Sequence, residues 1–385
     1  MTPRFRVLVV TMGTDYVAPA RMPRELSRAG FAVTVLAPKD ALATRTVHAA
    51  AIVRFPERAS IYEWLHTVAS TAQRSAAQLL LPGDDVTLRL LMRLVLDPPP
   101  ELKSDAMAEL AALVMRSLGD PAGYAASLVK SSLARVAASV GVAVPAGEAV
   151  GDEAAAVTVA DALGYPVIVR PLVGTAGVGV VRCADEAAVR QAMRDLPSPE
   201  SFPPIGNGRA LVQRLLTGLG ANHAAVSWQG RQLAGFTRTA VQTQRDEGGP
   251  SSVSRYTPQP GIAAGNQRLI AALGLTGFSS TEYLIDDATG VAHLIEINRR
   301  MTPATHTGAQ IGVDLAGALA AACTGRAWDG PTDVPAGIDR RLALFPQEWM
   351  RNPRSAHLAE IATDAPWDDP DLFASMLNLQ LERKS

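Results

Sequence analysis

The chain has 385 residues, and apolar residues make up 48% of them, which is enough for two or three compact units with cores of their own. Its 36 basic and 37 acidic residues nearly cancel, and no basic block is interleaved with aromatic residues, so nucleic acid is a poor partner. Cys183 and Cys323 are too few for a disulfide framework and have no neighbouring Cys or His at metal-ligand spacing. Because the first residues lack a signal-peptide core and no apolar run of about 18 residues occurs, we expect a soluble cytoplasmic protein without a membrane partner.

The first hundred residues alternate apolar strands with helices. Strands are expected at residues 6–11, 31–37, 50–55 and 78–81, with helices at 22–29 and 88–96. This β-α-β pattern predicts a parallel sheet. A dinucleotide site would need GxGxxG after the first strand, where Gly13 stands alone, so a Rossmann-type cofactor is not expected.

Asp84 and Asp85 follow the last of these strands. The carboxyl end of a parallel strand is a favoured place for ligands, which makes both residues candidates for a site. They fit the role of caps for the next helix equally well, so both interpretations remain open. Prolines at 98–100 then indicate a linker, and residues 101–118 predict an Ala- and Leu-rich helix.

The middle of the chain contains a glycine-rich loop. The expected elements are a helix at 124–141, a helix at 152–163, a strand at 165–171, a loop at 172–176 and a strand at 177–182. Gly174, Gly177 and Gly179 let the backbone approach an anion closely, and successive N–H groups in such a turn form a phosphate nest. No Gly-Lys-Ser/Thr follows, so the loop is not a Walker A motif. On the first of these helices, Lys130 lies opposite most apolar neighbours, which by itself indicates a surface lysine.

A second run of strands follows, interrupted by a polar segment. Strands are expected at 210–216, 224–228 and 231–238, helices at 265–273 and 313–323, and an added strand with capping helices after residue 328. Residues 241–262 are rich in Gly, Pro and Ser and show no clear period. This composition favours a long functional loop, although a disordered surface excursion has the same composition.

Residues 281–300, TEYLIDDATGVAHLIEINRR, carry the most informative pattern. Two alternating apolar runs flank a turn that ends in Gly290, which predicts an antiparallel hairpin. With a loop at 288–290, Glu282 lies across from Glu296, and Asn298 shares a face with Glu296. Like charges side by side are destabilising, so we expect a cation between them, and Mg²⁺ takes such oxygen ligands together with water and phosphates. The alternative is a solvated hairpin with two exposed glutamates, which the apolar neighbours make less favourable.

An acidic residue, one hairpin and then Glu-x-Asn closely followed by Arg299 and Arg300 resembles the metal site of the ATP-grasp superfamily. Members of that superfamily join a carboxylate to a nucleophile, usually an amine, through an acyl phosphate made from ATP. The resemblance covers roughly residues 120–325. It implies a multidomain chain of α/β and α+β class, in which a parallel α/β domain precedes the ATP-grasp fold. The implied units are an N-terminal domain at 1–100, a linker helix at 101–120, a lid with a glycine-rich flap at 121–210, a catalytic part at 211–328 and a C-terminal extension at 329–385.

The resemblance also implies the nucleotide contacts, with ATP and Mg²⁺, or Mn²⁺ in its place, as cofactors. Glu282, Glu296 and Asn298 would hold the metal. The nucleotide would be bound by Lys130 before the G-x-x-x-P turn at 141–145, by Arg170, by Gly174, Gly177 and Gly179, and by Gln213, Leu216 and Asn222. Arg170 stands where the family usually has lysine and Gln213 where it often has glutamate, and arginine and lysine are not equivalent at a strict phosphate site. Asn222 and His223 are explained equally well as a structural pair.

The remaining implied roles concern the reaction. Arg238 would end its strand near the phosphates, and Arg300 would position the carboxylate. Ser251, Ser252, Arg255 and His306 are the candidates for contacts with substrate. Small-molecule carboxylates and amines are the expected partners, and the sequence is compatible with a homodimer.

Three functions follow from the resemblance. The first is a ligase that couples a carboxylate, such as an amino acid or small peptide, to an amine with release of ADP and phosphate. The second is other ATP-grasp chemistry, either carboxylation or the synthesis of a nucleotide precursor. The third is a nucleotide-binding scaffold that does not catalyse, which the departures at Arg170 and Gln213 motivate.

Overall fold

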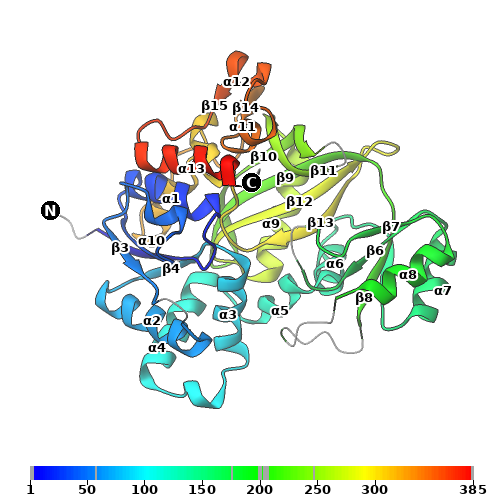
Figure 1. Cartoon of the computed structure of the whole chain (residues 1–385), viewed down its shortest axis with the longest axis horizontal. Coiled ribbons are helices and arrows are strands. Elements are labelled where there is room, and N and C mark those ends of the chain that lie inside the picture. The colour runs from blue at the N-terminus through cyan, green and yellow to red at the C-terminus, as the bar shows by residue number, and fades with distance from the viewer. Residues whose placement is uncertain are drawn as a thin grey trace.

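The computed structural model describes residues 4–56, 59–174, 177–197, 202, 208–245 and 248–382. The predicted loops at 172–176 and 241–262 therefore lie partly outside the described residues. Figure 1 shows a parallel sheet with its helices, a large antiparallel sheet, and a smaller lid that stands apart at the other side of the large sheet.

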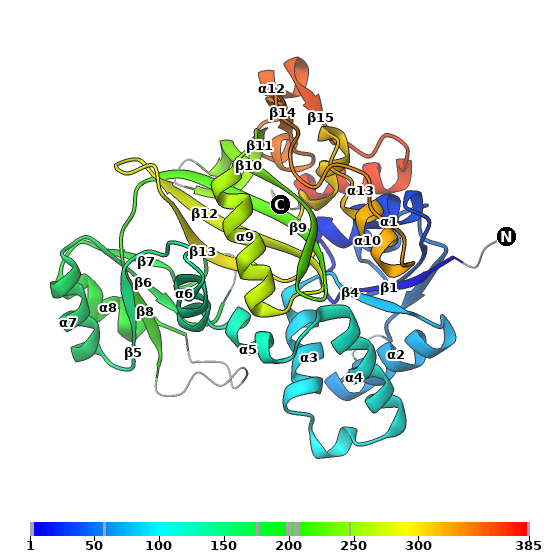
Figure 2. The same ribbon diagram turned by 180° about the vertical axis from the view of Figure 1, so that it is seen from behind.

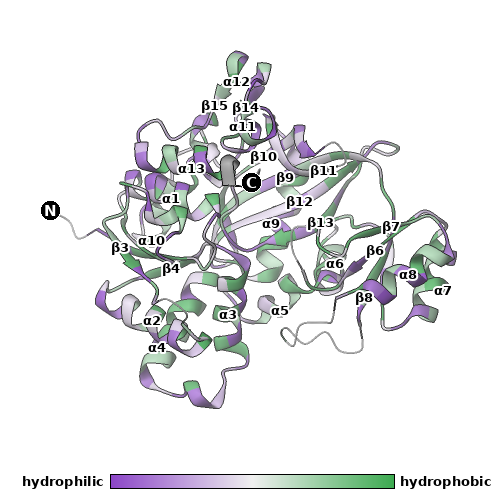
Figure 3. Cartoon of the chain, in the orientation of Figure 1, coloured by the Kyte–Doolittle hydropathy of each residue, from purple (hydrophilic) through white to green (hydrophobic). Residues whose placement is uncertain are grey.

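The N-terminal sheet is parallel, as predicted, with strand order β3-β2-β1-β4. Its strands are β1 (Arg6–Val10), β2 (Ala32–Ala37), β3 (Ala51–Arg54) and β4 (Leu79–Pro82). Alternate residues of β1 face opposite sides, because side chains alternate along a strand. Val7 and Val9 pack on α1 (Val17–Arg28), whereas Leu8 and Val10 pack on α2 (Ile61–Arg74), α3 (Asp85–Leu96) and α4 (Asp105–Leu118). Figure 3 shows α4 with alternating hydrophobic and hydrophilic residues, as expected for a helix that covers a sheet.

Several predicted helix boundaries are wrong, and the two helices described next are examples. Helix α1 begins at Val17, five residues before the predicted start, and Pro19 lies in its first turn, where a missing N–H costs nothing. The single helix predicted at 124–141 is two helices, α5 (Ala122–Leu128) and α6 (Lys130–Ser139). They are separated by Val129, whose backbone is extended with φ −101° and ψ 116°. Lys130 therefore stands at the first turn of a helix, and its N–H donates to Leu172 O at 2.9 Å.

The lid is an antiparallel sheet with order β5-β8-β6-β7. It consists of β5 (Gly147–Val150), β6 (Val167–Pro171), β7 (Val181–Cys183) and β8 (Ala210–Arg214), covered by α7 (Glu153–Leu163) and α8 (Glu186–Asp195). The strand predicted at 177–182 begins only at Val181. Gly177 and Gly179 have φ of +74° and +73°, a backbone conformation of turns and not of strands.

The large sheet has order β13-β12-β9-β10-β11-β14-β15. Its strands are β9 (Gly218–Trp228), β10 (Arg231–Arg245), β11 (Gly248–Tyr256), β12 (Gly277–Asp286), β13 (Ala292–Asn298), β14 (Arg340–Ala343) and β15 (Ala362–Thr363). Helix α9 (Pro260–Leu273) lies across one face of this sheet (Figure 2), and α10 (Leu315–Cys323) packs on the other. The 3-10 helices are η1 (Leu42–Thr44), η2 (Pro100–Leu102) and η3 (Thr305–Ile311).

The long loop predicted at 241–262 is wrong for most of its described length. Strand β10 continues to Arg245 and pairs with β11, and α9 begins at Pro260. Register shifts interrupt this pairing between Ala240 and Arg245. Such bulges break the two-residue period, so the strands leave no alternating pattern in the sequence.

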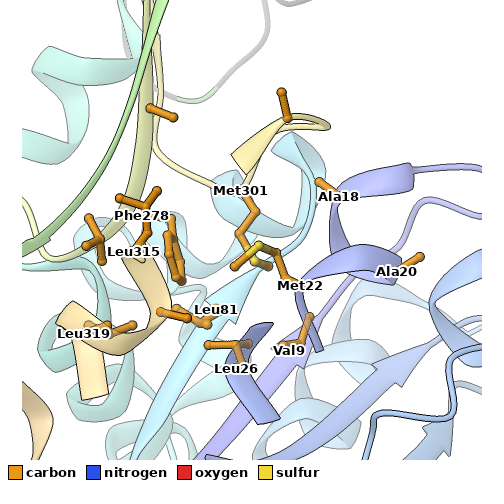
Figure 4. Close-up of a cluster of buried hydrophobic side chains, with 14 of the residues drawn as sticks. Val9, Ala18, Ala20, Met22, Leu26, Leu81, Phe278, Met301, Leu315 and Leu319 are labelled. Atoms are coloured by element: carbon orange, nitrogen blue, oxygen red, sulfur yellow. The ribbon is translucent and has the colours of Figure 1, made fainter. Parts of the chain in front are cut away.

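One hydrophobic core joins the N-terminal unit to the large sheet. Figure 4 shows Met22 and Leu26 of α1 gathered with Phe278 of β12 and with Leu315 and Leu319 of α10. These residues are at most 4% exposed. The predicted units at 1–100 and 211–328 therefore pack together through this core. The core fixes the position of the parallel sheet relative to the sheet that carries the acidic hairpin.

The C-terminal segment docks on both of these parts, and it has the predicted added strand and helices. After β14 it forms α11 (Gln347–Arg351), α12 (Ala356–Glu360), β15 and α13 (Pro370–Glu382). Asp364 is 2% exposed and accepts hydrogen bonds from His306 Nε2 at 2.7 Å and from Phe345 N at 2.5 Å. Arg21 of α1 donates to its backbone carbonyl and lies 4.0 Å from its carboxylate. Among the helices in the described ranges, none is long and apolar enough to cross a membrane.

We expect Asp364→Asn to lower the free energy of unfolding by about 3 kcal/mol or more, because it leaves the buried Arg21 without its anionic partner. The matched control is Asp368→Asn, since Asp368 is 39% exposed at its side chain and pairs with Arg24 at 2.7 Å on the surface. That change should cost about 1 kcal/mol or less. Urea unfolding of both variants measures the difference, and equal losses would contradict this account of the buried cluster.

Candidate active site

The hairpin of β12 and β13 places Glu282 directly across from Glu296, as predicted. The turn is one residue longer than expected, because Asp286 and not Asp287 lies opposite Val291, with Asp286 N donating to Val291 O at 2.9 Å. A register shift between Glu282 and Tyr283 compensates, with Ile295 as the extra residue on β13. This bulge brings the two glutamates opposite each other although the register at the turn differs.

The same alignment continues across the sheet. Glu296 pairs with Glu282, Glu282 with Asn222 on β9, and Asn222 with Arg238 on β10. Directly paired residues of neighbouring strands present their side chains on the same face. Four of the predicted residues therefore form one row, with two acids at one end, an amide in the middle and an arginine at the other end. At about 4.8 Å per strand, the row extends over about 14 Å.

The two carboxylates converge on Asn298. Its Nδ2 donates to Glu282 Oε1 at 3.2 Å and to Glu296 Oε1 at 3.4 Å. Burial, and next the neighbouring charge of Glu296, raise the pKa of Glu282 to about 7, although Arg238 and Arg300 act against this rise. Two acids that are this close and this little solvated are a poor arrangement without a cation.

The donor set fits a hard divalent cation. Carboxylate oxygens are the ligands that Mg²⁺ takes from proteins, and water and phosphate oxygens complete its shell. Within the described ranges, no group of three or more His, Cys, Asp or Glu side chains could hold a metal alone. A bound nucleotide would therefore have to supply part of the shell. Asn298 Oδ1 accepts from Arg300 Nη2 at 3.1 Å, so the free oxygen atoms come chiefly from the two glutamates.

A cleft of about 680 Å³ opens beside this row, between the lid and the large sheet. That volume lies in the usual range for a site that holds a small molecule. Its lining includes the predicted residues Arg170, Gln213, Leu216, Asn222, Arg238, Ser251 and Glu282. Residues 240–243 of the bulged β10 also line it, and the sequence offered no signal for them because they lay in the predicted loop.

Two arginines face the acids from different elements. Arg170 on β6 of the lid is 7% exposed, and its Nη2 donates to Ile295 O at 3.0 Å. Burial lowers the pKa of Arg170, while Glu296 and Glu282 act in the opposite direction. Arg238 donates from Nη1 to Ser254 Oγ at 3.0 Å. The Nε atoms of both arginines are buried and have no hydrogen-bond partner among the described residues, so each guanidinium has a donor that no protein group satisfies.

Lys130 lies on the other side of Glu296. Together with Gly174, Asp85, Glu296 and Asn298 it lines a small cavity of about 40 Å³. Its Nζ donates to Gly174 O at 2.7 Å. Burial lowers the pKa of Lys130 to about 8, although Glu296 favours the charged form. Lys130 is therefore half-buried at the site and is not the solvated surface residue that helix periodicity alone indicates. Gly177 and Gly179 form the turn before β7 and line neither of these cavities.

The role expected for Arg300 needs correction, and its neighbour Arg299 has a structural role. Arg299 is 4% exposed and serves packing, because it donates to Ser127 Oγ at 3.2 Å and lies over the Tyr124 ring at 4.9 Å. Arg300 directs both arms of its guanidinium to Asp85, with Nε to Oδ1 at 2.6 Å and Nη2 to Oδ2 at 2.7 Å. A fork that Asp85 occupies in this way is not available to a substrate carboxylate.

The two aspartates after β4 have different roles. Asp84 caps α3 by accepting from Thr87 N at 2.8 Å, and it also accepts from Thr11 Oγ1 at 2.7 Å and Met12 N at 2.6 Å. The capping interpretation is therefore right for Asp84. Asp85 contacts the candidate site through Arg300. This contact joins residues that are 215 positions apart, so the local sequence cannot show it.

Three candidate substrate residues lie elsewhere. Arg255 forms a surface pair with Asp339 at 2.6 and 2.7 Å, because its strand β11 is covered by β14 at that point. His306 is 6% exposed and bonds to Asp364, as described above. Ser252 is fully buried and donates to Gln242 O at 3.4 Å. Of the four candidates, Ser251 lines the cleft.

Comparisons with known proteins show which families and structures this chain is similar to. Residues 130–223 match the family model "Carbamoyl-phosphate synthase L chain, ATP binding domain". The structure is similar to a biotin carboxylase complex with beta-gamma-ATP from Campylobacter jejuni, with a TM-score of 0.68 and 17% identity over 88% of this chain and 75% of that one. It is also similar to an L-amino acid ligase from Bacillus licheniformis, with a TM-score of 0.59 and 15% identity over 88% of this chain and 80% of that one.

The chain has the ATP-grasp fold. The predicted resemblance and fold class are thereby confirmed. A sequence relative, "Putative urea carboxylase" of Emericella nidulans, is 25% identical over 162 residues, which is 40% of this chain and 13% of that protein. The chain thus spans a small part of that relative. The solved structures that share this fold include both a biotin carboxylase and an amino acid ligase.

We expect Glu282→Gln to stabilise the ligand-free protein by about 1 kcal/mol at pH 8, because it removes one of two opposed like charges. A raised pKa means that the stability contributed by protonated Glu282 is present below about pH 4.5 and is lost as the pH rises through about 7. The advantage of the variant should therefore shrink between pH 8 and pH 5. Thermal unfolding at both pH values measures this, and a variant less stable than the parent at pH 8 would contradict it.

Proposed function

We propose that this ATP-grasp chain is an ATP-dependent ligase that activates a carboxylate as an acyl phosphate and couples it to an amine. The observation that carries the proposal is the row of Glu296, Glu282, Asn222 and Arg238, of which the last three line one cleft. Its acidic end suits the metal of a nucleotide, and its basic end suits an anion about three strands away.

The residues around the cleft suggest how the nucleotide would lie. Gln213 is 5% exposed and Leu216 lies beside it at the end of the lid, so the adenine would occupy the apolar part of the cleft. Arg170 and Lys130 approach Glu296 from β6 and α6, so the phosphates would lie between them. Glu282 and Glu296 would hold Mg²⁺, which when bound to the phosphates neutralises the charge that develops during phosphoryl transfer.

The coupling reaction consists of two transfers. An oxygen of the substrate carboxylate attacks the terminal phosphorus of ATP, and ADP leaves. The amine nitrogen then attacks the acyl carbon, phosphate leaves, and the nitrogen gives up a proton. Arg238, with donors that remain available, would hold the carboxylate and later the negative oxygen of the tetrahedral species. Arg238 therefore takes the role that the sequence suggested for Arg300, whose fork is occupied by Asp85. The lid would keep water from the mixed anhydride.

Carboxylation is the second candidate. It is favoured by the similarity to the Campylobacter jejuni biotin carboxylase and to the sequence relative named above. Bicarbonate would then take the place of the organic carboxylate, and the same residues would serve the same transfers.

Release of ADP distinguishes these functions. The purified protein is supplied with Mg²⁺ and ATP, and then with amino acids alone, with amino acids in pairs, or with bicarbonate and an amine. We expect ADP and phosphate in equal amounts with paired amino acids, together with an amide product detected by mass spectrometry. Turnover that requires bicarbonate would establish carboxylation, whereas ATP binding without turnover in any mixture would indicate the non-catalytic scaffold.

We expect Arg238→Met to lower kcat/KM by about 100-fold or more, the usual loss when one donor to a developing negative charge is removed. The matched control is Arg231→Met, at the exposed start of the same strand β10. The control should retain the activity of the parent protein. Comparable activity in both variants would show that Arg238 does not act in the reaction.

A further inference from the structure

Asp85 and Arg300 form the main polar contact between the parallel sheet and the acidic hairpin. Asp85 is the first residue of α3, and Arg300 lies two residues after the end of β13. The two hydrogen bonds of 2.6 and 2.7 Å make a planar, bidentate pair. The side chain of Arg300 is 7% exposed and that of Asp85 21%. A fork of this kind fixes the orientation of the guanidinium and not only its charge.

The guanidinium of Arg300 in turn orients Asn298 of the candidate metal site. Its Nη2 also donates to Asn298 Oδ1 at 3.1 Å. The Nδ2 of the same amide donates to Glu282 and Glu296. A continuous chain of hydrogen bonds therefore runs from Asp85 through Arg300 and Asn298 to both carboxylates.

The position of Asp85 is itself well determined. Asp84 caps α3 and also accepts hydrogen bonds from Thr11 and Met12 at the end of β1, so the start of the helix is attached to the parallel sheet. The Tyr16 ring lies against the other side of the guanidinium, 5.0 Å from Arg300 Cζ.

A purely structural ion pair would not explain the whole arrangement. If Arg300 only joined two units, its remaining donors would have no reason to reach an amide between two acids. A substrate anchor is also a poor explanation, because Asp85 occupies the fork. Asp85 further lines the small cavity that contains Glu296, Asn298 and Lys130, so it lies next to the site and not at a remote contact.

We propose that Asp85 is a positioning residue of the divalent-cation site: by holding the fork of Arg300, it orients the Asn298 amide between Glu282 and Glu296. The inference rests on the metal site of the proposed function and not on the identity of the substrates. Residues that orient metal ligands from behind are needed for metal affinity, and their loss typically weakens binding about 10- to 100-fold.

The test measures Mn²⁺ affinity, using electron paramagnetic resonance of free Mn²⁺ in the presence of a non-hydrolysable ATP analogue. We expect Asp85→Asn to weaken Mn²⁺ binding about 10-fold or more. The matched control is Asp97→Asn, at the far end of the same helix, where Asp97 is 71% exposed and lies 3.8 Å from Arg93. The control should bind Mn²⁺ like the parent, and parental affinity in the Asp85 variant would overturn the proposal.

A double-mutant cycle shows whether Asp85 acts through Arg300. In an Arg300→Gln background, Asp85→Asn should add little further loss of Mn²⁺ affinity, because the pathway is already broken. Fully additive losses would overturn the pathway. Arg300→Lys retains the charge but not the fork, so it should weaken Mn²⁺ binding as Asp85→Asn does. It provides the same test if Asp85→Asn fails to fold, and parental affinity in it would likewise overturn the proposal.

The two experiments distinguish failure of the positioning role of Asp85 from failure of the ligase proposal. If no carboxylate and amine pair supports turnover while Mn²⁺ binding still depends on Asp85, the ligase fails and the positioning role stands. If turnover occurs and Asp85→Asn binds Mn²⁺ normally, the positioning role fails and the ligase stands. A parent protein that binds no Mn²⁺ with the analogue would refute the positioning role together with the metal site.

Discussion

Two like charges held opposite each other on adjacent strands are the constraint around which the site is arranged. Glu282 and Glu296 face each other across β12 and β13, and a single bulge at Ile295 produces this pairing. Burial, and next the neighbouring charge of Glu296, raise the pKa of Glu282 to about 7. A folded protein retains such a conflict when a ligand resolves it, since opposed like charges by themselves destabilise a sheet.

The surrounding elements place other charged side chains around this pair of acids. The lid brings Arg170 on β6, helix α6 brings Lys130 at its first turn, and β10 brings Arg238 at the far end of the row. The parallel sheet contributes Asp85, which reaches the pair through Arg300 and Asn298. Because the parallel sheet and the large sheet share one hydrophobic core, this last contact is made between parts that are fixed relative to each other.

The ATP-grasp fold leaves the choice of substrate to the cleft walls. The bulged part of β10 and residues 249–251 of β11 form one of these walls, opposite the lid. Bulges change the direction of side chains without changing the strand order, so this wall can differ between proteins that share the row of acids.

The sequence by itself determined the parallel sheet and the hairpin, because a strand period of two residues or a helix period of 3.6 residues is a local property that needs no distant partner. The opposition of Glu282 and Glu296 was predicted with another turn register and depends on the bulge at Ile295, which only the structure shows. The resemblance to the ATP-grasp superfamily also identified seven of the residues that line the cleft, among them Arg170, Gln213 and Arg238. The sequence did not reveal that Asp85 accepts both hydrogen bonds of the Arg300 guanidinium fork, that Asp364 binds His306 or that Asp339 binds Arg255. These pairings join residues 215, 58 and 84 positions apart, so only the tertiary structure decided which arginine is held and which remains available to a substrate.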